Sequence, residues 1–281
     1  MLKQRVITAL VLLLIVLPAL FYRSPAPFCV VALVLIAAGA WEWARLNGYG
    51  QMASLLSGLA CVVLCSLSWW LGALAQTMTL LWILAGASWV LAGSWVLHRG
   101  VAAWSGQPRV LRLLAGLIAL WMAWLAVAQA RGIGINFLLS ILLLVWVADI
   151  CAYFSGRALG GRFSRSKLAP SISPGKSWEG VWGGMLGVAV LAFGWRWIDV
   201  RWATTVPSLY AQLGFKGGLL LLVGVVFMVA MSVVGDLVES LVKRSAGVKD
   251  SSGLLPGHGG VLDRIDALLP TLPLAMMLYS V

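Results

Sequence analysis

The chain has 281 residues, of which 62% are hydrophobic and only 10% are charged. Soluble domains carry about 25% charged residues and about 45 to 50% apolar ones, so this composition excludes a soluble globular protein. Twenty lysines and arginines against nine acids give a net charge of +11. In a membrane protein such an excess belongs to cytoplasmic loops, so we expect a lipid bilayer and no nucleic acid as the partner.

Nine stretches of the chain are long and apolar enough to cross a bilayer, which takes about 20 residues in a helix. They predict an all-α, polytopic integral membrane protein with about nine transmembrane helices. The stretches, in chain order, are 6–22, 28–45, 52–72, 77–97, 110–130, 134–155, 178–198, 217–242 and 264–280.

The basic residues are distributed unequally between the two sides that this count defines. With the amino terminus inside, fifteen of the twenty cations fall on the cytoplasmic side. The asymmetry follows the positive-inside rule and supports the count. It places the two long loops, 156–177 and 243–263, together at the cytoplasmic face. The five cations on the other side are Arg23, Arg131, Arg196, Arg201 and Lys216.

The chain divides into two parts by where its polar residues fall. Residues 1–133 hold about five apolar spans, in which Glu42 is the one embedded acid. Residues 134–281 carry polar residues at helix ends and in both long loops. We therefore expect the catalytic region in 134–281, and a dimer contact or a lipid groove in 1–133.

Asp149, Asp236 and Glu239 lie in otherwise apolar helices, where an ionised carboxylate costs roughly 3 kcal/mol near the bilayer centre. One of these helices carries a polar stripe, because four of its residues follow helical spacing. They are Ser232, Asp236, Glu239 and Lys243. The alternative is an ion pair of Glu239 with Lys243 near the membrane surface, beside an aspartate whose hydrogen bonds are satisfied.

The loop 156–177 has the composition of a phosphate site, because it contains no acid and is rich in cations. A glycine and proline run from Ser173 to Ser177 precedes a helix start, where backbone N–H groups and the helix dipole favour anions. The spacing is not that of a P-loop, and an ordinary positive-inside loop is the alternative. The basic residues are Arg157, Arg162, Arg165, Lys167 and Lys176.

Two aspartates flank the loop 243–263. Asp236 ends one helix and Asp263 begins the next, so both can approach one point. Two carboxylates beside many cations suit Mg²⁺ bridging a polyphosphate. His258 lies among glycines, where a ligand can approach the backbone closely. The alternatives are a turn role for His258, an N-cap role for Asp263, and an ion pair of Arg264 with Asp266 at the helix start.

The stretch from Ser240 to Asp266 resembles the signature of the phosphatidate cytidylyltransferase family, also called CDP-diacylglycerol synthases. The matching residues are Ser240, Lys243, Arg244, Lys249, Asp250, Leu255, Pro256, His258, Gly259, Gly260, Asp263, Arg264 and Asp266. Upstream, the matching residues are Asp149, Ala152, Tyr153, Phe154, Gly156, Arg157, Gly160, Ser173, Pro174, Lys176, Trp178, Glu179 and Gly180. Members of that family commonly carry threonine at the position of Ser177. The serine of this chain keeps the hydroxyl group.

The resemblance implies a nucleotidyltransferase that converts CTP and phosphatidate to CDP-diacylglycerol and pyrophosphate. It also implies Mg²⁺ at Asp236 and Asp263 with K⁺ nearby, a homodimer, and an active site facing the cytoplasm in the plasma (inner) membrane of a bacterium. We assign catalysis to Asp236, Asp263, Lys249, His258 and Arg264. Substrate binding is assigned to Ser173, Lys176, Ser177, Lys243, Arg244, Asp149 and Arg157.

Two other functions remain open from the sequence. A CTP-dependent lipid kinase would transfer the γ-phosphoryl group and release CDP. A transporter of anionic solutes would place its charges near the membrane midplane in paired broken helices, whereas here the charges gather at one face.

Overall fold

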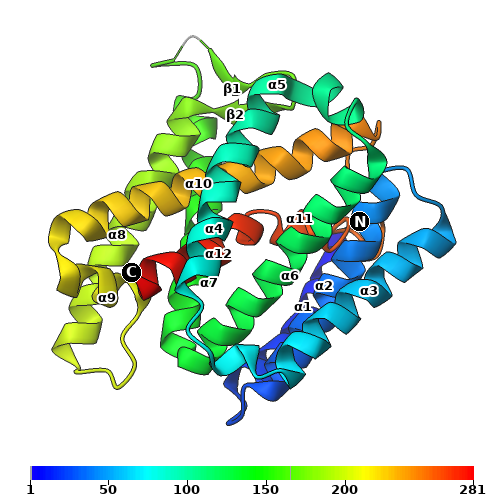
Figure 1. The fold of residues 1–281 in the computed structure, drawn as a ribbon. Helices are drawn as coiled ribbons and strands as arrows, with labels where there is room; N and C mark the ends of the chain where they lie inside the picture. Colours follow the sequence, from blue (N-terminus) through cyan, green and yellow to red (C-terminus); the bar gives the residue numbers. More distant parts are fainter. Residues whose placement is uncertain (1, 165) are drawn as a thin grey trace.

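The chain folds into a bundle of long helices, shown in Figure 1 as a computed structural model. The structure describes residues 2–164 and 166–281, so the predicted loop cation Arg165 lies outside the described residues. Eight described helices are long and apolar enough to cross a membrane. The prediction of an all-α, polytopic membrane protein is confirmed.

The amino-terminal part contains six α-helices and two short helical turns. These are α1 (Leu2–Phe21), α2 (Ala26–Leu46), α3 (Gln51–Trp70), the 3-10 turn η1 (Ala73–Ala75), α4 (Thr79–Ser88), the π-helical turn η2 (Trp89–Gly93), α5 (Ser94–Ser105) and α6 (Arg109–Ile133). The elements α4, η2 and α5 run on as one span, Thr79–Ser105.

The carboxyl-terminal part contains six further helices and one small β-ribbon. These are α7 (Ile135–Leu159), β1 (Lys167–Ala169), β2 (Ser173–Ser177), α8 (Trp178–Arg201), α9 (Leu209–Lys216), α10 (Gly218–Ser245), α11 (Leu262–Ile265) and α12 (Leu268–Ser280). The two strands pair antiparallel within the loop between α7 and α8.

The predicted ninth span, 264–280, differs from the structure. It contains the last two residues of the four-residue α11 and all of the 13-residue α12. An α-helix of that length rises about 20 Å, which is less than the hydrocarbon core of about 30 Å. Instead, α12 packs against α4, α6, α7 and α10, and Leu274 and Ala275 are fully buried. The apolar character of this segment therefore reflects burial in protein.

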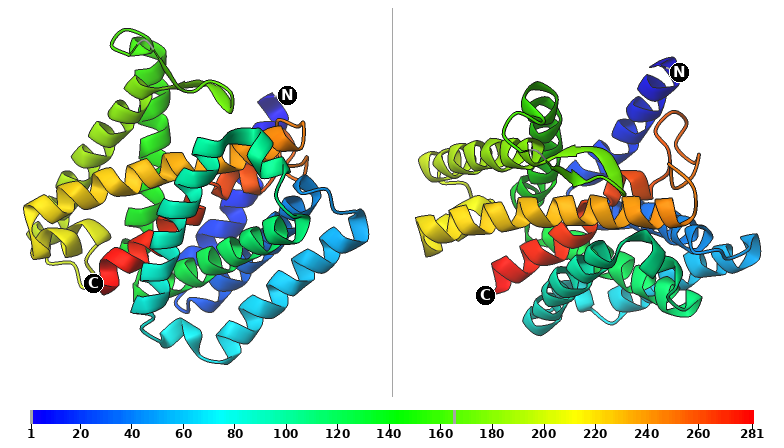
Figure 2. Two further views of the ribbon diagram at one scale, coloured as in Figure 1. Left: turned by 45° about the horizontal axis from the view of Figure 1, so that its top comes forward. Right: turned by 90° about the horizontal axis from the view of Figure 1, so that it is seen from above.

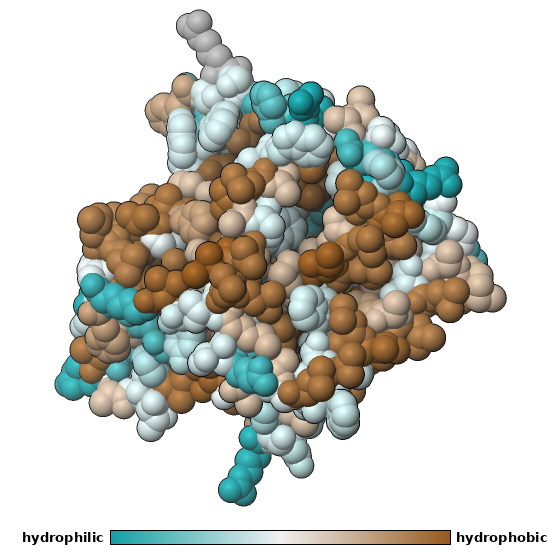
Figure 3. Space-filling view, in the orientation of Figure 1, coloured by the Kyte–Doolittle hydropathy of each residue, from teal (hydrophilic) through white to brown (hydrophobic). Residues whose placement is uncertain are grey.

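Large apolar side chains face outward along the long helices. Leu14 on α1, Leu91 in η2 and Leu219 on α10 are 72%, 71% and 76% exposed. Soluble monomers rarely expose contiguous apolar surface on this scale. Figure 3 shows hydrophobic residues across the middle of one face, with hydrophilic residues gathered toward its upper and lower margins. This surface suits a bilayer.

Helices α7 and α8 lie side by side in both views of Figure 2, and the β-ribbon projects from their common end. Their backbones approach closely because α8 presents glycines to α7. A side chain at Gly183 would collide with Ser155, and one at Gly187 would collide with Cys151. Small residues of this kind permit close helix packing inside membranes. This packing fixes the two ends of the loop that carries β1 and β2.

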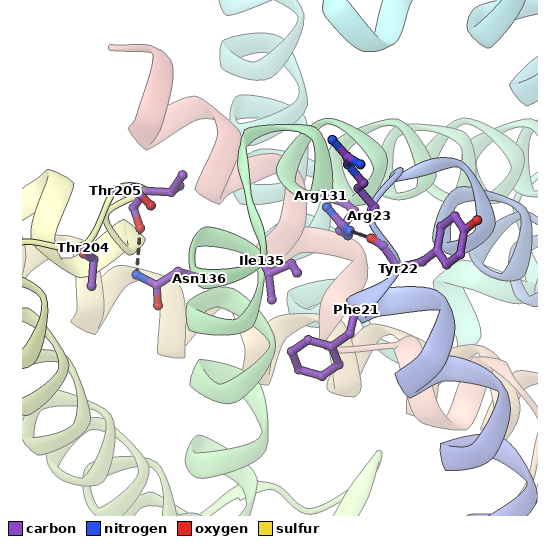
Figure 4. A pocket seen from close by; sticks show the side chains of 9 residues that line it. Phe21, Tyr22, Arg23, Arg131, Ile135, Asn136, Thr204 and Thr205 are labelled. Atoms are coloured by element: carbon purple, nitrogen blue, oxygen red, sulfur yellow. Dashed lines mark hydrogen bonds between the residues drawn. The ribbon is translucent and has the colours of Figure 1, made fainter.

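A cavity of about 480 Å³ lies at the end of the molecule opposite the β-ribbon (Figure 4). Arg23 and Arg131 border it from one side and Asn136 from another. Arg131 donates hydrogen bonds of 2.9 and 2.6 Å to the carbonyl groups of Leu20 and Tyr22. A cation at a helix carboxyl end is stabilising, so Arg131 ties the end of α6 to the end of α1.

Candidate functional site

A second cavity, of about 410 Å³, opens between α7, α8, α10 and the β-ribbon. It is lined by five residues that the sequence assigns to the site, and they come from three elements. The loop cations and the embedded acids, which are far apart in sequence, therefore border one space. The five residues are Asp149 and Arg157 of α7, Lys176 and Ser177 of β2, and Asp236 of α10.

Lys176 and Asp236 form an ion pair across this cavity. The Lys176 and Asp236 side chains are 27% and 30% exposed, so both remain accessible from the cavity. Asp236 also accepts a hydrogen bond of 3.3 Å from the hydroxyl of Ser240, one turn further along α10. The β-ribbon therefore places Lys176 in contact with Asp236 of the membrane-spanning helix α10.

Two side chains, Ser177 and Glu179, fix the start of α8 and the loop before it by accepting hydrogen bonds. The Ser177 hydroxyl accepts a hydrogen bond of 3.2 Å from the Gly180 N–H and is the N-cap of α8. Glu179 accepts hydrogen bonds of 3.1 and 2.8 Å from the N–H groups of Phe163 and Ser164. An N-cap satisfies one backbone donor that the first helical turn leaves open. Ser177 therefore has a structural role in addition to its place in the cavity wall.

Lys243 is shared by two buried acids. Its Nζ lies 2.5 Å from Oε2 of Glu239 and 2.6 Å from Oδ1 of Asp263. The Lys243, Glu239 and Asp263 side chains are 12%, 2% and 7% exposed. The backbone carbonyl group of Asp266 lies beside Gly235, the residue that precedes Asp236 in α10. Two lysines, Lys176 and Lys243, therefore pair with three carboxylates, those of Asp236, Glu239 and Asp263.

The carboxylate of Asp263 is held by several donors besides Lys243. Its Oδ2 accepts hydrogen bonds from the Ser251 N–H (3.0 Å), the Ser251 hydroxyl (3.0 Å) and the Gly260 N–H (2.7 Å). Burial alone raises the pKa of Asp263, but hydrogen bonds from Lys243, Gly260 and Ser251 outweigh it and hold the pKa below its ordinary value. Asp263 is therefore a charged group with a fixed orientation.

The remaining predicted site residues lie outside the cavity lined by Asp236. Lys249 is exposed on the loop after α10. The carbonyl group of His258 accepts hydrogen bonds of 3.1 and 2.6 Å from the Arg264 guanidinium. Arg244 donates to the carbonyl group of Ile172 at 3.3 Å, which joins the two long loops. Ser173 pairs with Ala169 in the ribbon.

The described residues contain no group of three acid, histidine or cysteine side chains close enough to hold a metal ion. Mg²⁺, however, typically takes one or two protein carboxylates and completes its shell with water and substrate phosphates. Asp236 lines the cavity and is partly exposed to it. The Asp236 carboxylate is therefore of the kind that such an ion takes from a protein.

Sequence reasoning left three acids out of the site. Asp266 packs against α10 at Gly235, Glu179 holds the loop before α8, and Glu42 of α2 binds the loop that precedes Asp263. The available signal was the isolation of an acid among apolar residues, which singles out Glu42 in the amino-terminal part. The partner of such an acid cannot be read from helical spacing.

A profile of the cytidylyltransferase family matches residues 3–281. The chain belongs to this family. It is therefore a nucleotidyltransferase, and the resemblance found in the sequence motifs is confirmed.

Similar proteins match along almost their whole length. The phosphatidate cytidylyltransferase of Pseudomonas aeruginosa is 44% identical over 285 residues, covering 100% of this chain and 98% of that protein. The phosphatidate cytidylyltransferase of Haemophilus influenzae is 39% identical and covers 99% of each chain. The protein of the same name from Brucella suis is 37% identical and covers 99% of this chain and 92% of its own.

The shared lysine predicts a stability effect. Replacing Lys243 by methionine leaves Glu239 and Asp263 buried without their cation, so we expect the free energy of unfolding to fall by about 3 to 5 kcal/mol. The measurement is thermal unfolding of the purified protein in detergent. Lys216→Met, at an exposed lysine of α9, is the control and should unfold like the parent. Equal midpoints for both variants contradict the assignment.

Proposed function

We propose that the cavity bordered by Lys176 and Asp236 is where this cytidylyltransferase joins CTP to phosphatidate, yielding CDP-diacylglycerol and pyrophosphate. The family and the shared name of the relatives support this activity. The observation that carries it is the meeting of loop cations and embedded acids around one space of about 410 Å³ beside lipid-facing helices. A nucleotide and a lipid head group can meet there while the acyl chains stay in the bilayer.

The proposed reaction is a single displacement at phosphorus. A phosphate oxygen of phosphatidate attacks the α-phosphorus of CTP, and the bond from that phosphorus to the oxygen bridging the β-phosphorus breaks. A phosphate monoester has a second pKa of about 6, so the nucleophile is already largely ionised at neutral pH. The site therefore has to supply positioning and charge neutralisation, and no strong general base.

The cations of the cavity are assigned to the phosphates. Lys176 and Arg157 line the space, and Lys176 can leave Asp236 for an incoming triphosphate because both side chains are partly exposed. Lys243 is engaged by two acids, so we assign it to holding the carboxylates together. Lys249, His258 and Arg264 lie outside this cavity, and their catalytic roles stay predictions.

Asp236 and Asp263 are the proposed magnesium ligands, with Asp266 beside them. Asp236 offers oxygens to the cavity, and Asp263 offers Oδ1, which in the structure accepts a hydrogen bond from Lys243. These carboxylates would hold the ion, and a magnesium ion held there would supply positive charge to the triphosphate. The nearby K⁺ and the homodimer stay predictions from the family resemblance.

The site is proposed to face the cytoplasm from a bacterial inner membrane. Bacterial relatives support the setting. The excess of cations at the end that carries the 156–177 and 243–263 loops supports the orientation through the positive-inside rule. CTP would then be drawn from the cytoplasm, and phosphatidate from the inner leaflet.

Product identification tests the reaction. Purified protein supplied with CTP and phosphatidate should release pyrophosphate and form CDP-diacylglycerol, both only when a divalent cation is present. Phosphorus NMR distinguishes the products directly. Release of CDP instead of pyrophosphate would establish the lipid kinase, and solute flux into vesicles without turnover of CTP would establish the transporter.

A pair of lysine variants tests the site. Lys176→Met removes a charge that the account assigns to the triphosphate, so kcat should fall by about 100- to 1,000-fold. Lys167→Met alters an exposed lysine of β1 in the same ribbon, and it should stay within about twofold of the parent, as surface substitutions usually do. Equal losses in the two variants would refute a specific role for Lys176.

A further inference from the structure

Glu42 is a fully buried acid of α2, distant in sequence from both long loops. Its carboxylate accepts four hydrogen bonds, and all four donors come from the loop between α10 and α12. The donors are the N–H groups of Val261 (2.9 Å) and Leu262 (2.7 Å) and the hydroxyls of Ser251 (3.1 Å) and Ser252 (2.5 Å). A carboxylate can only accept, so this set of donors matches it fully.

The four donors lie at the two ends of one loop. Ser251 and Ser252 precede residues 253–260, and Val261 and Leu262 follow them. Leu262 is the first residue of α11, which carries Asp263. One carboxylate of the amino-terminal part therefore closes this loop and fixes the chain immediately before Asp263. The α1 residue Thr8 adds a hydrogen bond of 2.9 Å to the carbonyl group of Pro256, within the same loop.

Ser251 links Glu42 directly to Asp263. Its hydroxyl oxygen lies 3.1 Å from Glu42 Oε2 and 3.0 Å from Asp263 Oδ2. A hydroxyl has one proton, so it donates to one of these carboxylates at a time. Gly260 lets the network close, because a side chain at that position would collide with Glu42 and with Ser251. The orientation of Asp263 therefore depends on a residue of the opposite part of the chain.

We infer that Glu42 is a positioning residue for the site: it holds the 251–262 segment so that Asp263 presents its carboxylate toward α10 and toward the divalent cation. This gives α2 a part in the chemistry that the amino-terminal helices otherwise lack. The inference rests on the proposed function for its meaning in catalysis. The geometry behind the inference does not depend on the reaction. It consists of four hydrogen bonds, one of them from a hydroxyl that also contacts Asp263.

The test compares three variants of the full-length protein with the parent. Glu42→Gln keeps the size of the side chain but replaces one acceptor oxygen by a donor that faces other donors. Ser251→Ala removes only the hydroxyl that joins Glu42 to Asp263. Asp199→Asn is the matched control, because Asp199 is also a buried carboxylate that accepts hydrogen bonds from a loop, at the opposite end of the molecule.

Two measurements need no turnover. Binding of Mn²⁺ in the presence of CTP, followed by electron paramagnetic resonance, should weaken by about 10- to 100-fold in Glu42→Gln and in Ser251→Ala, as outer-shell substitutions around a metal typically do. Hydrogen exchange of the 251–262 segment should accelerate in Glu42→Gln. Asp199→Asn should change neither quantity, whatever it does to thermal stability. In turnover assays, the apparent affinity for Mg²⁺ should fall in parallel with Mn²⁺ binding.

The outcomes separate the two proposals. Mn²⁺ binding and exchange that match the parent in Ser251→Ala and Glu42→Gln overturn the positioning role, as does an equal effect in Asp199→Asn. If Glu42→Gln fails to fold, Ser251→Ala alone decides, because an unchanged Mn²⁺ affinity in it refutes the link to Asp263. If the parent itself releases no pyrophosphate from CTP, the proposed function fails while the binding and exchange measurements still stand.

Discussion

Burial of carboxylates inside a lipid-facing bundle is the constraint on which the site depends. An acid in a membrane helix costs about 3 kcal/mol even on the mildest scales, and an unpaired buried charge is strongly destabilising. Here Lys243 is shared by Glu239 and Asp263, and Lys176 pairs with Asp236. The three acids outnumber these two lysines. The proposed divalent cation, entering with the nucleotide, would offset this excess.

Close backbone packing makes this concentration of charge possible. At Gly235, next to Asp236, a side chain would collide with the carbonyl group of Asp266 and with Pro270. Helix α10 therefore approaches the start of α12 only because position 235 is glycine. The glycine face of α8 does the same for α7 and brings the β-ribbon over the cavity. Close packing at these glycines therefore brings the charged side chains of separate helices near one another.

Much of the fold and of the site could be predicted because the relevant signals are local. Long apolar runs predict spans, and the spacing of Asp236, Glu239 and Lys243 predicts one helical stripe, which the structure bears out. The break of the segment 264–280 into two short helices could not be predicted, because hydropathy does not distinguish lipid from a protein interior. Its apolar side chains are covered by other helices.

The pairings between distant residues could not be predicted. Nothing in the sequence says that Lys176 meets Asp236, or that Lys243 reaches Asp263 across a loop. Ser177 was predicted to bind substrate, and the structure shows that its hydroxyl caps α8. Glu42 was visible as an isolated acid, but its partners lie more than two hundred residues away.

The most direct test is a structure determined with Mn²⁺ and a CTP analogue that has a methylene group between its α- and β-phosphorus atoms. The account predicts a manganese peak bonded to Asp236 and Asp263, phosphates in the cavity bordered by α7, α8 and α10, and Lys176 moved from Asp236 to a phosphate oxygen. Phosphates bound elsewhere, with Lys176 still paired to Asp236, contradict it.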